Sequence, residues 1–337
     1  MSIPLIFDSD MIGDDILALI AAAGLPVELR AVTAYGRRVS ATERACLAVK
    51  LLHRLGLAHV PAAAGASRPL LRAPRIGCTA CDEPIFQFLS RGRTDDGPDD
   101  RYSASVDSRP AAQLIIDLAR DAPHEITVLC TGPLTNLATA VVLEPRLAEW
   151  IKEVVIMGGV AWVPGRSTPV SESNIYNDPE AAAIVFDRFP RITMVGLDVT
   201  MQTLIGPSAL HELLDHTPDL QALATGIVSS CITKQAEQNL HRMPLHDPLA
   251  LIAVCEPSLL RTIPCQVQVE TGGQYTLGQT VCRPLTASEQ NEHGRKVVLV
   301  ATEVDSERAI AMFQESIRKA LEASASTPNH VEGAGKR

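Results

Sequence analysis

The stretch IPLIFDSDMIGDDILALI, residues 3–20, is the most informative part of this sequence. An apolar run ends at Phe7, four aspartates fall within residues 8–15, and a second apolar run begins at Ile16. This pattern predicts a buried strand, a loop and a helix. Because open α/β sheets place their functional groups beyond the carboxyl ends of the strands, we expect the aspartates at that edge.

The four aspartates, Asp8, Asp10, Asp14 and Asp15, indicate a cation site. Like charges so close together raise each other's pKa and destabilise the fold unless a cation neutralises them. Oxygen ligands with no nearby Cys or His indicate a hard ion, Ca²⁺ or Mg²⁺. The alternative interpretation is a solvated acidic turn in which an aspartate caps the following helix.

The composition limits the classes of function. With 337 residues and 46% hydrophobic content, the chain can bury a large α/β core. Its net charge of −9 argues against a nucleic acid or an anionic membrane surface as partner. The apolar stretches are too short to span a bilayer and the N-terminus lacks a signal-peptide pattern, so we expect a cytoplasmic location.

The eight cysteines are scattered, so we expect most of them to be buried thiols in a reducing compartment. The CTAC sequence at residues 78–81 has the spacing of a zinc or redox pair. No second Cys or His pair is placed to complete a tetrahedral site, so the pair is interpreted as incidental.

Strand-like runs at 3–7, 28–33, 126–130, 153–157 and 192–196 alternate with helical patterns. This alternation predicts a mostly parallel sheet with helices on both faces, in a single α/β domain over residues 1–323. The polar segment 90–109 is either a cover over the site or an exposed insertion. The tail 324–337 is expected to be disordered.

Four later segments place polar residues at predicted strand ends or turns. They are CTGPLTN at 130–136, MGG at 157–159, ESNIYNDPE at 172–180 and PLHDP at 244–248. With the N-terminal aspartates, and with GASRPL at 65–70 and ETGG at 270–273, they resemble the inosine-uridine preferring nucleoside hydrolase family in sequence order. The resemblance extends from Ile3 to about Ala311.

The resemblance implies a Rossmann-like nucleoside hydrolase fold and the hydrolysis of the N-glycosidic bond of a ribonucleoside, giving free base and ribose. It implies one Ca²⁺ at the carboxyl edge of the sheet as the sole cofactor, and a nucleoside-like small molecule as substrate. A role in purine and pyrimidine salvage and a homodimeric or homotetrameric assembly are further implications of the same resemblance.

The resemblance also implies a set of ligands for the metal. These are the carboxylates of Asp10, Asp15 and Asp247 and the backbone carbonyl of Thr131. Such a set leaves room for water and for ribose hydroxyls around Ca²⁺, which takes about six to eight oxygen ligands. Asp10 would also accept the proton of the attacking water, because glycoside cleavage needs an activated nucleophile.

By the same resemblance, Asp14, Asn174 and Asp247 bind the ribose hydroxyls, Glu172 lies near the 5′-hydroxyl, and Met157 belongs to the substrate-binding set. His246 matches the acid that protonates the leaving base, a task suited to a group that titrates near neutral pH. The alternative for this histidine is that it only orients the neighbouring Asp247.

The chain departs from the family pattern near the predicted pocket. The changes are Met11-Ile12-Gly13 in place of Pro-Gly-x, Arg37 and Arg166 where asparagine is common, Ser173 in place of Phe, and Ile76 in place of a frequent His. The first change requires the turn to close differently. The two arginines either bind an anionic riboside such as a 5′-phosphorylated one, or pair within the protein, Arg166 with Glu172 and Arg37 with a loop aspartate.

Two other functions remain as alternatives. An apolar strand followed by Asp-x-Asp also opens the haloacid-dehalogenase phosphatases, but that interpretation leaves the four later motifs unexplained. A non-catalytic ligand-binding member of the family is the second alternative, although every predicted calcium ligand is present. The nucleobase would meet the segment 238–242, where no motif predicts a base preference.

Overall fold

The computed structural model describes residues 2–73, 100–206, 242–290, 292 and 296–325, with six further positions from 220 to 230. Several sequence-based predictions lie outside these residues. They concern the CTAC pair, Ile76, the first part of the segment 90–109, most of the predicted base-binding segment and the tail beyond 325.

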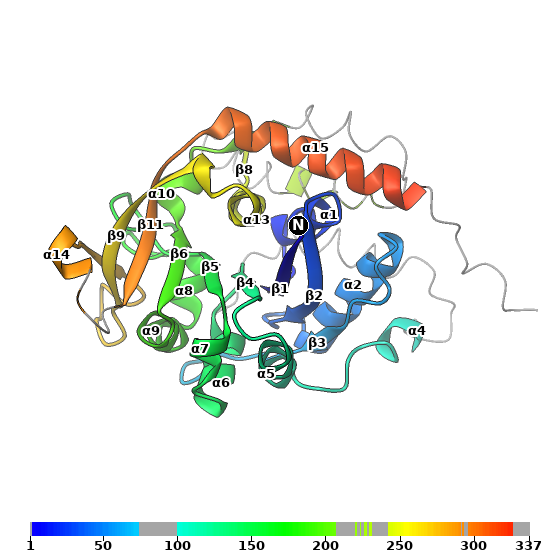
Figure 1. The fold of residues 1–337 in the computed structure, drawn as a ribbon, viewed down its shortest axis with the longest axis horizontal. Coiled ribbons are helices and arrows are strands. Elements are labelled where there is room, and N and C mark those ends of the chain that lie inside the picture. The colour runs from blue at the N-terminus through cyan, green and yellow to red at the C-terminus, as the bar shows by residue number, and fades with distance from the viewer. Residues whose placement is uncertain are drawn as a thin grey trace, which may run out of the picture.

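A nine-stranded sheet forms the centre of the described part of the molecule, in the order β10-β9-β11-β6-β5-β4-β1-β2-β3 (Figure 1). The strands from β3 to β11 in this order run parallel, and β9 and β10 continue the sheet antiparallel. The strands are β1 (Ile3–Ser9), β2 (Val27–Ala34), β3 (Ala62–Ala64), β4 (Thr127–Cys130), β5 (Glu153–Met157), β6 (Arg191–Val195), β9 (Leu260–Val269), β10 (Thr280–Pro284) and β11 (Val297–Val304). All five predicted strands are confirmed, as is the mostly parallel sheet.

Helices cover both faces of the sheet (Figure 1). Along β1 the side chains alternate between two cores, with Leu5 and Phe7 in one and Ile6 in the other. Because both faces are covered, β1 is apolar along most of its length, which is typical of a central parallel strand. The first core packs against α1 (Asp14–Ala22), α2 (Ala41–Arg54), α13 (His246–Cys255) and α15 (Ser306–Ala325), and the second against α5 (Ala111–Asp121), α6 (Thr135–Leu143) and α9 (Pro179–Arg188).

Shorter elements complete the described residues. A separate two-stranded sheet pairs β7 with β8, and it lies next to the start of α13 in the chain. The remaining elements are α4 (Asp100–Ser103), α7 (Leu147–Trp150), α8 (Ser173–Asn177), α10 (Leu197–Thr200), β7 (Leu204–Ile205), β8 (Met243–Pro244), a 3₁₀ turn at Pro257–Leu259 and α14 (Ala287–Gln290).

The turn between β1 and α1 contains two residues with positive φ, Met11 at 52° and Gly13 at 61°. A left-handed conformation is costly for a side chain such as methionine, so neighbouring groups must hold it. The Met11 amide donates to Ser9 Oγ (2.8 Å), and Arg44 Nη1 donates to the Met11 carbonyl (3.0 Å). The altered turn is therefore closed from both sides, by its own strand and by α2.

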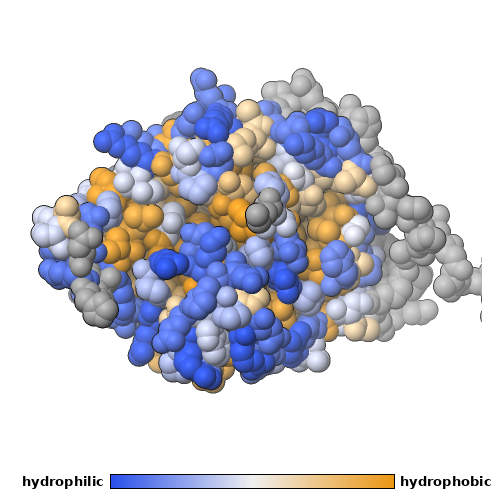
Figure 2. Space-filling model, in the orientation of Figure 1, coloured by the Kyte–Doolittle hydropathy of each residue, from blue (hydrophilic) through white to orange (hydrophobic). Residues whose placement is uncertain are grey.

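The surface carries apolar side chains between hydrophilic ones on the side where β9 and β11 lie (Figure 2). Val281 on β10 and Leu299 on β11 are among the exposed apolar residues. No helix in the described part of the chain combines the length and apolar character that crossing a membrane requires. Among the described cysteines, Cys130 and Cys265 are buried free thiols, and the other three are half-buried free thiols.

Candidate active site

The predicted site residues meet at the carboxyl ends of the central strands. Register aligns these ends: Ser9 on β1 pairs with Ala34 on β2, and Asp8 on β1 pairs with Cys130 on β4. Asp10 and Thr131 therefore leave neighbouring strands side by side, and Met157 ends the next strand along. The carboxyl edge of the sheet is thus lined by residues far apart in sequence.

Asp15 ties the first turn to the loop after β4. Its carboxylate accepts hydrogen bonds from Ser9 Oγ (2.7 Å), the Ile12 amide (3.0 Å) and Thr131 Oγ1. Burial raises the pKa of Asp15 well above its usual value, and the charges of Asp10 and Asp14 raise it further. These hydrogen bonds hold the carboxylate in one orientation, facing its acidic neighbours.

Asp14 caps a helix that begins 232 residues later. Its Oδ2 accepts the backbone amides of His246 (2.9 Å) and Asp247 (3.0 Å) in the first turn of α13. A carboxylate at a helix start satisfies amides that have no partner within the helix. The capping role of an aspartate is thus real, but the helix is α13 and not the adjacent α1, and the neighbouring carboxylates are buried and not solvated.

Asp247 lies in that first turn of α13 and is buried. Burial raises the pKa of its carboxyl group well above the usual value, and the charges of Asp14, Asp15 and Asp10 add to the effect. The charges of Asp10 and Asp14 therefore act on both Asp15 and Asp247, and these four carboxyl groups form one acidic cluster. Such a cluster stabilises a positive charge brought close to it.

Asn174, in α8, connects three elements of the site. Its Nδ2 donates to the carbonyls of Thr131 (2.9 Å) and Met157 (3.1 Å), and its Oδ1 accepts from Arg37 Nη2 (3.0 Å). The two carbonyls only accept and the guanidinium only donates, so the orientation of the amide is determined by its partners. Asn174 therefore links the ends of β4 and β5 to the loop after β2.

Arg37 lies inside the cluster. Its Nε is 2.6 Å from Asp10 Oδ2, and the side chains of the pair are 9% and 6% exposed. The predicted pairing of Arg37 with a loop aspartate is confirmed, and the aspartate is Asp10 itself. The positive charge on this arginine is thus already matched within the protein.

Glu172 is held by the backbone at the start of α8. Its carboxylate accepts the amides of Asn174 (2.8 Å), Gly159 (3.1 Å) and Ile175 (3.2 Å). Burial raises its pKa, while these amides and the charge of Arg37 oppose the rise. The backbone amides and Arg37 therefore offset the cost of burying the Glu172 carboxylate.

His246 faces Thr200 with one ring nitrogen and Arg166 with the other. Its Nδ1 is 2.8 Å from Thr200 Oγ1, and its Nε2 is 3.5 Å from Arg166 Nη1. A guanidinium only donates, so Nε2 is assigned as the acceptor and Nδ1 as the protonated nitrogen. Burial lowers the pKa of His246, and Arg166 lowers it further against the opposing charge of Asp14. The geometry favours a neutral imidazole.

Some residues of the quoted motifs support the site, although the resemblance predicts no ligand role for them. Asp8 Oδ1 accepts from Thr33 Oγ1 (2.7 Å) and Asn136 Nδ2 (2.8 Å), and burial raises its pKa to about 6. Asp178 accepts from Thr135 Oγ1 (2.6 Å) and from the Ala181 amide (3.1 Å) at the start of α9. These motif residues hold the loops that carry the site.

Other supporting residues had no signal in the sequence. Arg44 is buried in α2, and Thr200 lies in α10. Asp198, also in α10, accepts the amides of Ala161 and Trp162 (both 2.8 Å) and so fixes the loop after the MGG motif. Only the folded arrangement brings these side chains to the site.

The donor set suits a hard cation in its chemistry, because the predicted ligands are buried oxygens of Asp10, Asp15, Asp247 and Thr131. Their present partners differ from those of a metal site. Asp10 is paired with Arg37, and the Thr131 carbonyl accepts from Asn174. Within the described residues, no three Asp, Glu, His or Cys side chains are grouped so that they could hold a metal ion.

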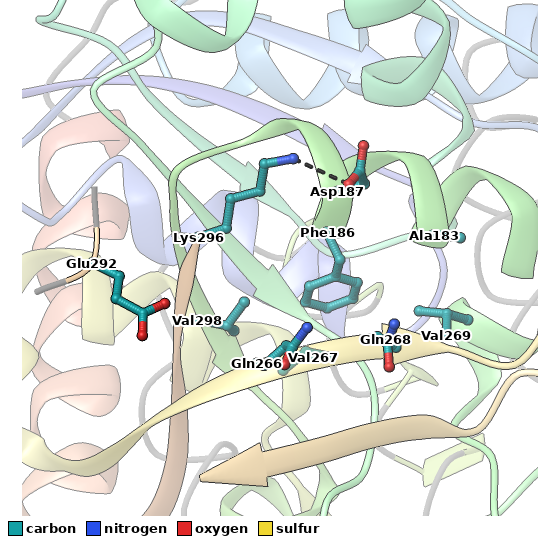
Figure 3. Close-up of a pocket in the computed structure, with 10 residues that line it drawn as sticks. All are labelled: Ala183, Phe186, Asp187, Gln266, Val267, Gln268, Val269, Glu292, Lys296 and Val298. Atoms are coloured by element: carbon teal, nitrogen blue, oxygen red, sulfur yellow. Dashed lines mark hydrogen bonds and ion pairs between the residues drawn. The ribbon is translucent and has the colours of Figure 1, made fainter. Parts of the chain in front are cut away.

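A separate hollow of about 530 Å³ lies between α9, β9 and β11 (Figure 3). Phe186 and Val298 point into it, and Lys296 forms an ion pair with Asp187 (3.1 Å) at its rim. None of the predicted site residues lines this hollow. The chemistry predicted from the motifs therefore belongs to the carboxylate cluster and not to this hollow.

Comparisons with known proteins agree with the motifs. The family model for "Inosine-uridine preferring nucleoside hydrolase" matches residues 5–311. The chain is 35% identical over 279 residues to a relative of that name from Leishmania major and 37% identical over 286 residues to one from Crithidia fasciculata. Each of these alignments covers 82% of this chain and 86% of the relative.

A solved structure shows the same likeness in three dimensions. The purine-preferring ribonucleoside hydrolase from Gardnerella vaginalis superposes with a TM-score of 0.80 and 28% sequence identity. The superposition covers 95% of this chain and 99% of that chain. The fold expected from the resemblance is therefore confirmed over nearly the full length.

Proposed function

The chain belongs to the inosine-uridine preferring nucleoside hydrolase family, and from this membership we propose that it hydrolyses the N-glycosidic bond of ribonucleosides to free base and ribose. The observation that carries the proposal is the convergence of Asp10, Asn174 and Asp247 on one buried edge of the sheet. These residues come from three distant motifs, and the match to the family includes all three. Family membership removes the phosphatase alternative.

The carboxylate cluster suits the charge that develops in this reaction. Glycoside cleavage passes through an oxocarbenium-like sugar, which nearby negative charge stabilises. Asp10, Asp15 and Asp247 are buried together, so where these carboxyl groups are ionised their charges act through little intervening water. In the proposed mechanism Asp10 accepts the proton of the attacking water, while Asp247 and Asp15 stabilise the ring.

Ribose binding is proposed for the residues that surround the cluster. Asp14, Asn174 and Asp247 would hold the hydroxyls of the ring, and Glu172 would lie near the 5′-hydroxyl with Met157 beside it. The backbone bonds of Glu172 and the two carbonyl contacts of Asn174 orient these side chains before substrate arrives. Preorganisation of this kind reduces the cost of placing the sugar for attack.

His246 is the proposed acid for the departing base, and Arg166 lies next to it. A lowered pKa leaves a small protonated fraction at neutral pH, so the imidazole would have to donate from a minor form. The alternative is that His246 only orients Asp247, its neighbour in the chain; the printed contacts of the imidazole are with Thr200 and Arg166. A substrate whose leaving group departs without a proton separates these two roles, because it does not need an acid but still needs a correctly oriented Asp247.

Calcium is the proposed cofactor, with Asp10, Asp15, Asp247 and the Thr131 carbonyl as its ligands. When bound, it would lower the pKa of a water molecule and hold ribose oxygens. A role in purine and pyrimidine salvage and a homodimeric or homotetrameric assembly are proposed on the family resemblance alone, and the cytoplasmic location stays the expectation drawn from the sequence. Base preference is not assigned, since the names of the relatives differ in the base they specify.

The anionic-riboside alternative now depends on one arginine. Arg37 is paired with Asp10 inside the site, and Arg166 is exposed beside His246, where its guanidinium could meet an acidic group on the substrate. The alternative of a non-catalytic member has less support, because the predicted catalytic and ribose-binding residues are present and clustered. We therefore propose the nucleoside as substrate and keep the 5′-monophosphate as a comparison in the assay.

The test is ribose release by the purified protein from a panel of common nucleosides and their 5′-monophosphates, with and without Ca²⁺. Asp10→Ala is the blank, because it removes the proposed proton acceptor. Release of ribose from nucleosides by the wild-type protein alone supports the proposal. Activity on no nucleoside with Ca²⁺ present would refute it.

A further inference from the structure

The loop that carries Arg37 is held rigidly against the site. The Gly36 amide donates to the Ala66 carbonyl (2.8 Å), and the Arg37 amide donates to Val39 O (2.9 Å). A Cβ on Gly36 would lie 2.4 Å from the Ala41 nitrogen, so only glycine fits this close approach. Ser40 then closes the loop with a capping box at the start of α2. The backbone therefore presents the Arg37 side chain to the carboxyl end of β1.

The guanidinium of Arg37 contacts two predicted site residues at once, one predicted to bind the metal and one predicted to bind the ribose. Its Nε lies 2.6 Å from Asp10 Oδ2, the predicted metal ligand and proton acceptor. Its Nη2 lies 3.0 Å from Asn174 Oδ1, the predicted ribose ligand. A single side chain thus spans the place where the resemblance puts both the cation and the sugar.

The contact with Asp10 is close but imperfect. Nε of Arg37 is buried and has no hydrogen-bond partner, so the 2.6 Å contact is an ion pair whose angle does not make a hydrogen bond. A buried donor without a partner is unfavourable, which weakens the hold of the pair on this position. The Asp10 carboxylate can therefore release Arg37 and bind another positive group that it contacts with better geometry.

A divalent cation and the Arg37 guanidinium cannot both occupy Asp10. They would use the same carboxylate, and two positive groups at that distance in a buried site repel each other. The neutral asparagine that is common at this position in the family has no such conflict. The substitution thus changes the balance of charge at the site and leaves the predicted ligands intact.

We propose that Arg37 competes with the divalent cation for Asp10, so that cation binding requires the guanidinium to leave both Asp10 and Asn174. This inference rests on the proposed calcium-dependent function. Cation binding and exposure of the ribose-binding Asn174 then occur together, since one movement releases both. The chain would bind Ca²⁺ more weakly than a variant with asparagine at position 37.

Calorimetric titration with Ca²⁺ tests the competition directly, without any substrate. Arg37→Asn is compared with the wild-type protein and with Arg38→Asn, the matched control on the exposed neighbouring arginine. A hydrogen bond from a charged donor, such as that of Arg37 Nη2 to Asn174 Oδ1, corresponds to a change of roughly tenfold to a hundredfold in affinity, so Arg37→Asn, which lacks the guanidinium that must be displaced, should bind Ca²⁺ that much more tightly. Arg38→Asn should match the wild-type protein.

Equal affinities of wild type and Arg37→Asn would overturn the proposal, and so would a failure of both to bind. A crystal structure of the wild-type protein grown with saturating Ca²⁺ gives a second measurement that needs no variant. A cation on Asp10 with the guanidinium displaced supports the proposal. A cation on Asp10 beside an intact Arg37 pair overturns it. Equal Ca²⁺ affinities leave the proposed nucleosidase activity intact, whereas failure of both proteins to bind also removes the proposed cofactor, and the ribose-release assay then tests the hydrolysis separately.

Discussion

The buried carboxyl group of Asp8 should make the protein less stable as the pH rises. Its pKa is raised in the folded protein from 3.8 to about 6, chiefly by burial beneath the site. Because the folded value is the higher one, the stabilising contribution is complete below about pH 4 and is lost as the pH rises through 6. The difference in pKa corresponds to about 3 kcal/mol of unfolding free energy.

Asp8→Asn removes this pH dependence. An asparagine is neutral like the protonated acid, and its Oδ1 can still accept from Thr33 and Asn136. Between about pH 4 and pH 8 the variant should therefore gain about 3 kcal/mol in unfolding free energy relative to the wild-type protein.

The measurement is urea unfolding at several pH values in the presence of a chelator, followed by circular dichroism. Subtracting the wild-type curve from the variant curve isolates Asp8 from the other carboxylates, which titrate in both proteins. Asp121→Asn is the matched control, because its side chain is 71% exposed and should leave the pH profile unchanged. A difference between Asp8→Asn and wild type that stays constant with pH would refute the reasoning.

Three further substitutions test the site. Asn174→Asp turns a carboxylate oxygen toward the carbonyls of Thr131 and Met157, so each carbonyl loses its donor. We expect the unfolding free energy to fall by about 1–3 kcal/mol for each carbonyl, and a denaturation midpoint equal to that of the wild-type protein would contradict this. His246→Gln should lower kcat on nucleosides by roughly 10²–10⁴ but spare a p-nitrophenyl riboside, whose leaving group needs no proton; equal losses on both substrates would assign His246 the orienting role. Arg166→Asn should lower turnover of 5′-monophosphates and leave nucleosides unaffected if the substrate is anionic, whereas equal loss on both would exclude the anionic riboside.

Much of the fold could be predicted from the residues alone. Each central strand is a short apolar run bounded by turn residues, and the runs alternate with helical patterns, so the sheet follows from local periodicity. The antiparallel strands β9 and β10 were not predicted, because at the sheet margin their residues are partly exposed and the apolar signal is weaker. The turn after β1 was expected to differ, but the left-handed Met11 and its support from Arg44 were not.

Motif order and apolar period are local properties of the chain, so the family, the parallel sheet and the edge at which the carboxylates gather could be predicted from the residues. The interaction partners of the individual polar side chains, in contrast, depend on the folded arrangement. Arg37 meets Asn174 across 137 residues and Asp14 caps a helix 232 residues away. Such choices depend on strand register and on the direction of each side chain at the sheet edge, since a buried charge pairs with whichever group the fold brings within reach. For that reason the sequence left open whether Arg37 meets a substrate or the protein's own aspartate, and the folded chain pairs it with Asp10.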